Sequence, residues 1–115
     1  MQNSKLNQLT AHELIKKLED KEITAEEILI ALKKRIEELD SKIRAYVRLK
    51  EIDKVTSGPG NTAMAPLKGL PITIKDNICT EGINTECCSK ILMGFKPPYD
   101  ATVIKKLKEA GVSIF

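Results

Sequence analysis

The chain has 115 residues, of which 42% are hydrophobic, 30% are charged and only 3% are aromatic. This composition is typical of a single soluble globular domain with an aliphatic core, and it argues against a disordered chain. The formal net charge is +3 without a basic arm, so the charge gives no case for direct nucleic-acid binding. No apolar run approaches the ~20 residues that span a bilayer, and the first residues lack a signal-peptide core. We therefore expect a cytoplasmic protein without membrane contact.

The cysteines indicate neither a disulfide framework nor a metal site. Cys79, Cys87 and Cys88 are odd in number and two of them are adjacent, which is a poor pattern for disulfides. No CxxC spacing occurs, and the single histidine, His12, is far away and expected to be an exposed helix residue. We expect reduced, mostly buried thiols, and no metal or cofactor held by this chain.

Two helices are predicted near the N-terminus. Capping boxes of the form T-x-x-E occur at 10–13 and 24–27, and apolar residues recur behind each at helical spacing. They predict helices over 11–20 and 25–39 that could pack as an antiparallel pair, preceded by a frayed lead-in at 1–9. Neither helix can bury its apolar stripe alone, so both need a larger body.

Extended structure is predicted in the middle of the chain. Residues 43–49 alternate imperfectly between apolar and polar, which indicates a half-buried strand, and 50–68 reads as a linker with a Gly/Pro-rich turn. The segment 69–77, GLPITIKDN, organises the rest of the chain. Its β-branched run predicts a buried strand over 70–74 that opens at a proline.

Lys75 follows this strand directly and has two possible interpretations. A lysine at a strand end is most often a solvated charge, because lysine is almost never fully buried. Alternatively, a lysine in a low-dielectric site loses its proton more easily and acts as a general base. The local pattern does not choose between the two.

The C-terminal part predicts a crossover connection. Residues 78–84 read as loop or edge structure, and a short apolar piece at 91–93 leads to a proline turn. Asp100 is an N-cap candidate for a helix over 101–110, with Gly111 as its C′ residue and a buried strand following at 112–115. A strand, helix and strand in this order indicate a parallel pair. So small a sheet with an unpaired edge leads us to expect the front of a longer fold.

Four blocks of sequence carry a resemblance to a known family. They are GLPITIKDN at 69–77, TECCSKIL at 85–92, PPYDATVI at 97–104 and LKEAG at 107–111. In this order and spacing the chain resembles the amidase signature family, and within it the group of A subunits of glutamyl-tRNA(Gln)/aspartyl-tRNA(Asn) amidotransferases. The N-terminal region matches that group more loosely.

The resemblance implies an α/β fold around a mixed sheet that is several times longer than this chain. The 115 residues would then be the N-terminal portion of one amidase domain. Its parts would be a helical lead-in at 1–42, a strand and linker at 43–68, and the start of the catalytic sheet at 69–115.

The chemistry implied by the resemblance is amide hydrolysis by a Ser–cis-Ser–Lys triad. Lys75 matches the triad lysine, and Asp76 and Asn77 match supports of its turn. In such an A subunit, glutamine is hydrolysed and the ammonia passes to a B subunit that amidates misacylated tRNA, with B and C subunits as partners. ATP, magnesium and tRNA would be used by the whole complex and not bound by this chain. Neither triad serine has a match, and no role passes to Ser89 or Ser113.

Departures from the family leave other interpretations open. The Gly/Pro-rich segment after residue 50 is short where the family usually has a helix, and Cys88 stands where the family favours a small residue. The chain could instead be a fragment of another amidase-signature hydrolase, or a non-catalytic remnant or helical interaction module. In each case the isolated 115 residues are expected to lack glutaminase activity.

Overall fold

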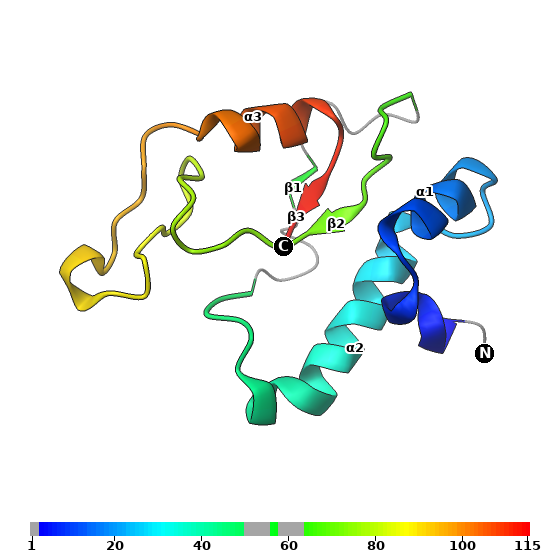
Figure 1. The fold of residues 1–115 in the computed structure, drawn as a ribbon, viewed down its shortest axis with the longest axis horizontal. Coiled ribbons are helices and arrows are strands. Elements are labelled where there is room, and N and C mark those ends of the chain that lie inside the picture. Colours follow the sequence, from blue (N-terminus) through cyan, green and yellow to red (C-terminus); the bar gives the residue numbers. More distant parts are fainter. Residues whose placement is uncertain (1–2, 50–55, 58–63) are drawn as a thin grey trace.

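The computed structural model describes residues 3–49, 56–57 and 64–115, and combines three α-helices with a small sheet (Figure 1). In chain order its elements are η1 (Asn3–Gln8), α1 (Ala11–Glu19), α2 (Ala25–Ile43), β1 (Thr56–Ser57), β2 (Pro71–Ile72), η3 (Lys90–Leu92), α3 (Thr102–Glu109) and β3 (Ser113–Ile114). Helices and a parallel strand pair together are compatible with part of an α/β fold.

The sheet has the order β1–β3–β2, with β3 in the centre. β2 pairs with β3 in parallel, and Ile72 lies opposite Ile114. The predicted crossover through α3 is therefore confirmed, although the strand expected over 70–74 is only two residues long. On its other edge β3 pairs with β1 in antiparallel orientation. Part of the expected linker at 50–68 is thus a strand, while residues 50–55 and 58–63 lie outside the described ranges.

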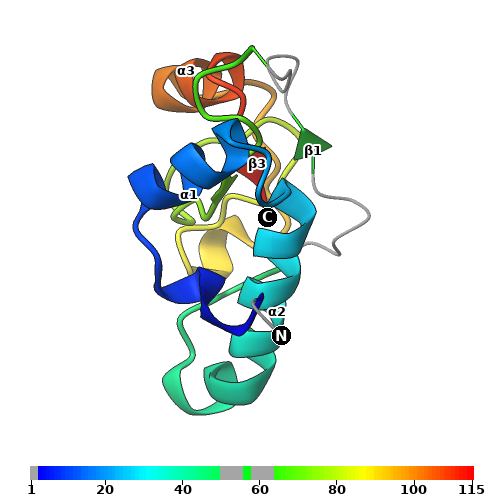
Figure 2. The ribbon, with the colours of Figure 1, turned by 90° about the vertical axis from the view of Figure 1, so that its right-hand side faces the viewer.

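Two apolar clusters hold the helices on opposite sides of the strands (Figures 1 and 2). The first joins η1, α1 and α2 around Ile28 and reaches Leu70, just before β2. The second joins α3 to β3 through Ile104 and Val112, both fully buried. Leu67 packs against both clusters, so it connects the helical layer to the sheet.

The N-terminal lead-in was expected to be frayed, but its described part is ordered. Residues 3–8 form η1, and Leu6 is buried in the first cluster. The expected antiparallel pair of α1 and α2 is not the main contact of α2: η1 packs along α2, and α1 joins the same apolar cluster through Leu14. Burial of the Leu6 side chain outweighs the weak helical tendency of this polar stretch.

Helix α2 runs four residues beyond its expected end at residue 39. It ends at Ile43. The next residue, Arg44, is its C-cap and has a left-handed φ of 55°, and the Asp40 carboxylate accepts a hydrogen bond from the Ala45 amide at 2.8 Å. The strand expected over 43–49 was wrong, because no strand forms there and Val47 and Leu49 are exposed. Alternation of apolar and polar residues does not stabilise a strand that has no neighbouring strand to pair with.

Helix α3 begins one residue later than expected, with Ala101 and not Asp100 at its N-cap. The Asp100 carboxylate instead accepts hydrogen bonds from the Glu81 amide at 2.8 Å and from Lys108 Nζ at 2.7 Å. It therefore joins the preceding loop to the helix. Gly111 has the positive φ expected of a C′ residue, at 86°.

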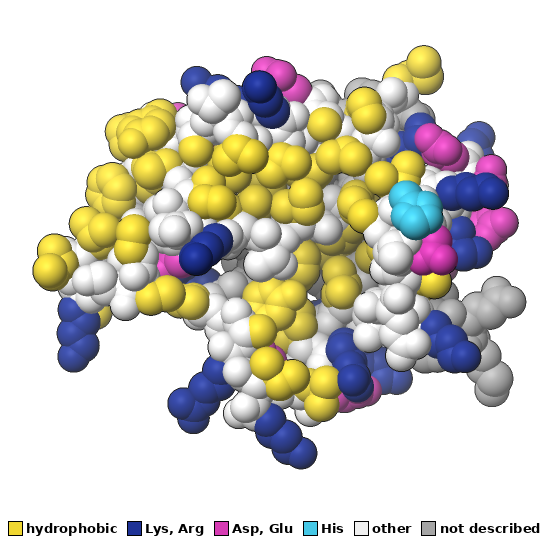
Figure 3. All heavy atoms as spheres, viewed as in Figure 1, with side chains coloured by type: hydrophobic (Ala, Val, Ile, Leu, Met, Phe, Trp, Pro, Cys, Tyr) yellow, Lys and Arg dark blue, Asp and Glu magenta, His cyan; other side chains and the backbone are white. Residues whose placement is uncertain are grey.

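Apolar side chains remain at the surface. Figure 3 shows them gathered in a broad band across one face of the molecule. The segment around η3, which projects at the left of Figure 1, carries exposed Ile91, Met93 and Phe95. Within the described residues, no helix is long and apolar enough to cross a membrane.

Candidate functional site

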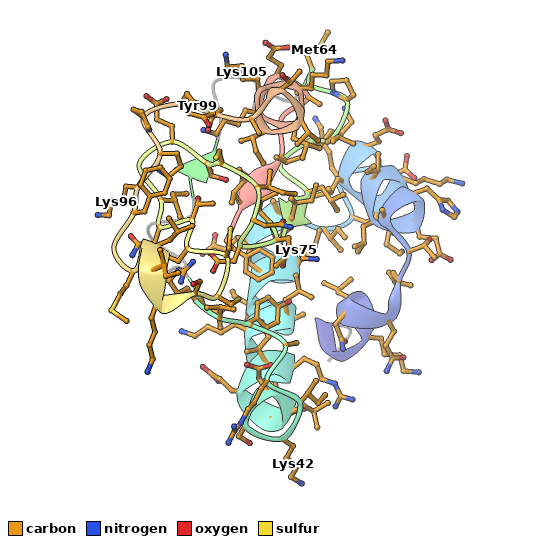
Figure 4. All side chains as sticks on the ribbon, turned by 60° about the vertical axis from the view of Figure 1, so that its left-hand side comes forward. Lys42, Met64, Lys75, Lys96, Tyr99 and Lys105 are labelled. Atoms are coloured by element: carbon orange, nitrogen blue, oxygen red, sulfur yellow. The ribbon has the colours of Figure 1, made fainter. Side chains whose placement is uncertain are left out.

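Lys75 lies in a turn beyond the end of β2. The Ile78 amide donates to the Lys75 carbonyl oxygen at 3.0 Å, which closes the turn. On either side of the lysine, Ile74 and Ile78 pack into the second apolar cluster and hold the turn against the sheet. The Lys75 side chain itself is exposed. In Figure 4 it lies beside the strands near the middle of the molecule, whereas Lys42, Lys96 and Lys105 lie at the periphery.

Lys75 opens onto a groove of about 940 Å³. The coil after α2, the turn around Lys75, the loop at 82–88 and the end of β3 form its walls. At one end the Tyr46 and Phe115 rings lie 6.1 Å apart, and the Tyr46 hydroxyl is 3.5 Å from that of Thr73. The groove thus combines apolar rings with the Lys75 amine, two thiols and the side chain of Asn77.

Asp76, next to Lys75, faces away from solvent and fixes the facing loop. Its carboxylate accepts hydrogen bonds from the Cys88 amide at 2.9 Å and the Glu86 amide at 3.3 Å, and its carbonyl oxygen accepts from the Cys87 amide at 2.9 Å. Burial acts to raise the pKa of Asp76. The amides of Cys88 and Glu86, together with Arg48, outweigh it and hold that pKa below its ordinary value.

Arg48 joins this site from the coil after α2. Its guanidinium donates to Glu86 Oε1 at 2.7 Å, to the Asn84 carbonyl oxygen at 2.9 Å and to the Asp76 carboxylate. The other Glu86 oxygen accepts from Asn84 Nδ2 at 3.2 Å and from the Gly94 amide. We call Arg48, Asp76 and Glu86 the carboxylate clamp.

Arg48 and Glu86 were not predicted as site residues from the sequence. Arg48 lies within the segment 43–49 that was expected to be a strand, and nothing local marks it as a partner of residues 28 and 38 positions away. The role expected for Asp76 as a support of the turn agrees with its contacts. Asn77 is exposed at the groove.

The cysteines differ in exposure, and the expectation of mostly buried thiols was wrong. Cys79 is half-buried, with its sulfur 3.6 Å from the Tyr99 hydroxyl, a contact that raises the pKa of Tyr99. Cys87 and Cys88 are exposed at the groove, and both have a left-handed φ of 52°. The adjacent pair therefore forms the tip of a tight turn, which turns their side chains out of the core.

Two serines and the histidine named from the sequence do not line the groove. Ser89 caps η3 by accepting the Ile91 amide at 3.3 Å, and Ser113 is buried within β3. His12 is exposed in the first turn of α1, as expected. Across the described ranges, no three His, Cys, Asp or Glu side chains gather closely enough to hold a metal ion.

Comparisons with known proteins agree with the sequence blocks. Residues 27–115 match the family model for Amidase. The chain is 48% identical to the A subunit of glutamyl-tRNA(Gln) amidotransferase from Halothermothrix orenii, with 92% of the chain and 22% of that protein aligned. It is also 48% identical to the protein of that name from Heliobacterium modesticaldum, and 44% identical to the one from Natranaerobius thermophilus. These alignments cover 93% and 96% of the chain, and 23% and 24% of the two relatives.

The chain spans less than a quarter of the length of these relatives. The family model, by contrast, covers well over half of the chain. The groove-lining segments lie within the residues that this model matches. The chain therefore belongs to the amidase family.

Proposed function

We propose that this chain is the N-terminal portion of an A subunit that hydrolyses glutamine for a tRNA-dependent amidotransferase, with Lys75 as its general base. The position of Lys75 is the observation that carries the proposal. It is an amine held at the end of a sheet, at the mouth of a groove, in a chain that is 48% identical to a protein of that name. The ends of parallel strands are common places for reactive groups.

The proposed chemistry gives Lys75 one task. As a neutral amine it accepts the proton of a bridging serine, which in turn deprotonates the serine that attacks the amide carbonyl. The chain contributes the position of the amine, because Ile74 and Ile78 anchor its turn in the sheet cluster. The serines belong to parts of the family domain with no match in residues 1–115. Those parts would also cover Lys75, whose exposure here leaves its amine solvated.

The proposed partners follow from the relatives' name. We expect B and C subunits to receive the ammonia and to bring ATP, magnesium and tRNA in the cytoplasm. None of these is assigned to a residue of this chain. Full-length relatives of the family would complete the α/β fold around β2 and β3 as a larger mixed sheet.

A chimera tests the proposal directly. Residues 1–115 replace the aligned 22% of the Halothermothrix orenii protein, and ammonia release from glutamine is measured with and without Lys75→Ala. We expect an active chimera, and a fall in kcat of about a hundredfold to ten-thousandfold with KM little changed, as for loss of a general base. Lys105→Ala is the matched control, since that exposed lysine lies on α3 away from the groove.

The outcomes separate the candidate functions. Near-normal turnover by the Lys75→Ala chimera would show that Lys75 is not the general base. Hydrolysis of other small amides with no release of ammonia from glutamine would favour another amidase-signature hydrolase. The unmodified 115-residue chain is expected to release no ammonia, and release that disappears in Lys75→Ala would contradict that expectation.

A further inference from the structure

Three segments that are distant in sequence meet at one guanidinium. Arg48 follows α2, Asp76 lies beside Lys75, and Glu86 lies in the loop that forms the facing wall of the groove. Only 9% of the Asp76 side chain and 15% of the Glu86 side chain remain exposed, against 37% for Arg48. The carboxylates are therefore largely withdrawn from water, while the guanidinium that joins them is more exposed.

The two carboxylates require a cation between them. Arg48 supplies charge-assisted donors to both Asp76 and Glu86. Without that cation, two partly buried negative charges would face each other across the junction of turn and loop. Removing one partner of such a group leaves uncompensated charge, which is more disruptive than losing a surface ion pair.

We propose that Arg48 is a positioning residue for the site, which locks the Lys75 turn to the loop at 84–94 and so fixes where the amine stands in the groove. This inference rests on the proposed function of Lys75. The connection is short, because Asp76 is the neighbour of Lys75 and accepts from both the guanidinium and the loop amides. Arg48 itself touches no reacting atom in this scheme.

An arginine suits this place better than a lysine. A planar guanidinium donates in several fixed directions and binds two carboxylates and a carbonyl at once, whereas an ammonium group is a point charge on a flexible stem. Arg48→Lys should keep the charge but lose part of the three-way connection. Arg48→Gln should lose both. The clamp therefore predicts that Arg48→Lys behaves between the unsubstituted chain and Arg48→Gln.

Hydrogen exchange on the full 115-residue chain tests the lock. In Arg48→Gln we expect the Glu86 and Cys88 amides, and the Ile78 amide that closes the Lys75 turn, to exchange about tenfold faster or more, with Arg48→Lys in between. The Ser113 amide, which donates to Leu70 within the sheet, should be unchanged. Arg35→Gln is the matched control, because Arg35 is 52% exposed and pairs at the surface with Glu38.

Unchanged protection of Glu86 and Cys88 in Arg48→Gln would refute the lock. If the Ser113 amide also exchanges faster in Arg48→Gln, that variant has lost its fold, and Arg48→Lys is measured in its place. Faster exchange of the Glu86 and Cys88 amides in Arg48→Lys, with an unchanged Ser113 amide, then supports the lock. Exchange equal to that of the unsubstituted chain refutes it.

The chimera tests positioning separately. Arg48→Gln should lower kcat about tenfold or more with little change in KM, and Arg48→Lys should restore part of it. Full activity of Arg48→Gln in a chimera that Lys75→Ala inactivates would refute the positioning role. If Lys75→Ala stays active, the proposed function has failed, and the lock is then judged by hydrogen exchange without reference to catalysis. Faster exchange of the Glu86, Cys88 and Ile78 amides in Arg48→Gln supports the lock, and unchanged exchange refutes it.

Discussion

The packing under the Lys75 turn can be tested by truncating Ile104. This side chain on α3 has no exposed surface and contacts the cluster that includes Ile74 and Ile78. Ile104→Ala removes three carbons, worth about 0.8 kcal/mol each by transfer, and leaves a cavity, so we expect a loss of about 3 to 4 kcal/mol. That is a large fraction of the stability of a domain of this size.

Hydrogen exchange measures this loss at the sheet. The amides of Ser113 and Phe115 donate to the Leu70 and Ile72 carbonyls, at 3.0 and 3.3 Å, and report whether β2 and β3 stay paired. A loss of about 3 kcal/mol makes them exchange roughly 150-fold faster. The control is Val103→Ala at a neighbouring site with 48% exposure, where less than about 0.5 kcal/mol is expected. Equal effects of the two substitutions would refute the assignment of the core.

Two further predictions concern the clamp and the helix caps. The pKa of Asp76 is lowered from 3.8, so its contribution to stability is fully present above that value and is lost as the pH falls through the lowered pKa. The protection of the Cys88 amide, which is its exchange rate corrected for the intrinsic pH dependence of amide exchange, should fall correspondingly on acidification, and Asp76→Asn should abolish that change. Protection of Cys88 that stays constant over this pH range in the unsubstituted chain would contradict the clamp. Thr24→Ala should cost about 1 kcal/mol, because the Thr24 hydroxyl accepts the Glu27 amide at 3.2 Å, and Thr24→Ser should retain most of it, as measured by helical circular dichroism. Equal helicity of the alanine and serine variants would contradict this role of the hydroxyl.

The features that were predictable from the sequence have local causes. Thr24 and Glu27 exchange hydrogen bonds within one turn, so their identities and spacing suffice to place the start of α2. The crossover over 70–115 was also predictable, because a short β-branched run, a periodic helix and a second apolar run permit few arrangements. Gly111 marks the end of α3 for a similarly local reason.

The features that were missed depend on tertiary partners. The alternation at 43–49 indicates a strand, yet Arg48 binds carboxylates brought in by turns much later in the chain. Asp100 has the identity of an N-cap, but Lys108 and the Glu81 amide compete for it. At the site, the position of Lys75 after a strand was predictable, and its exposure agrees with the interpretation of a solvated charge at a strand end. The clamp was not predictable, since it depends on which segments lie opposite.

The turn at 86–89 restricts which residues its two central positions tolerate. The Ser89 amide donates to the Glu86 carbonyl at 2.9 Å across Cys87 and Cys88, and both cysteines have positive φ. Glycine, asparagine and aspartate occupy such a pair with little strain, whereas valine, isoleucine and threonine do not. The positive φ of Cys88 gives a backbone reason for the small residue that the resemblance leads us to expect at this position. In a library of variants at these two sites, we expect the folded variants to be those whose residues accept a positive φ, whether or not they carry a thiol.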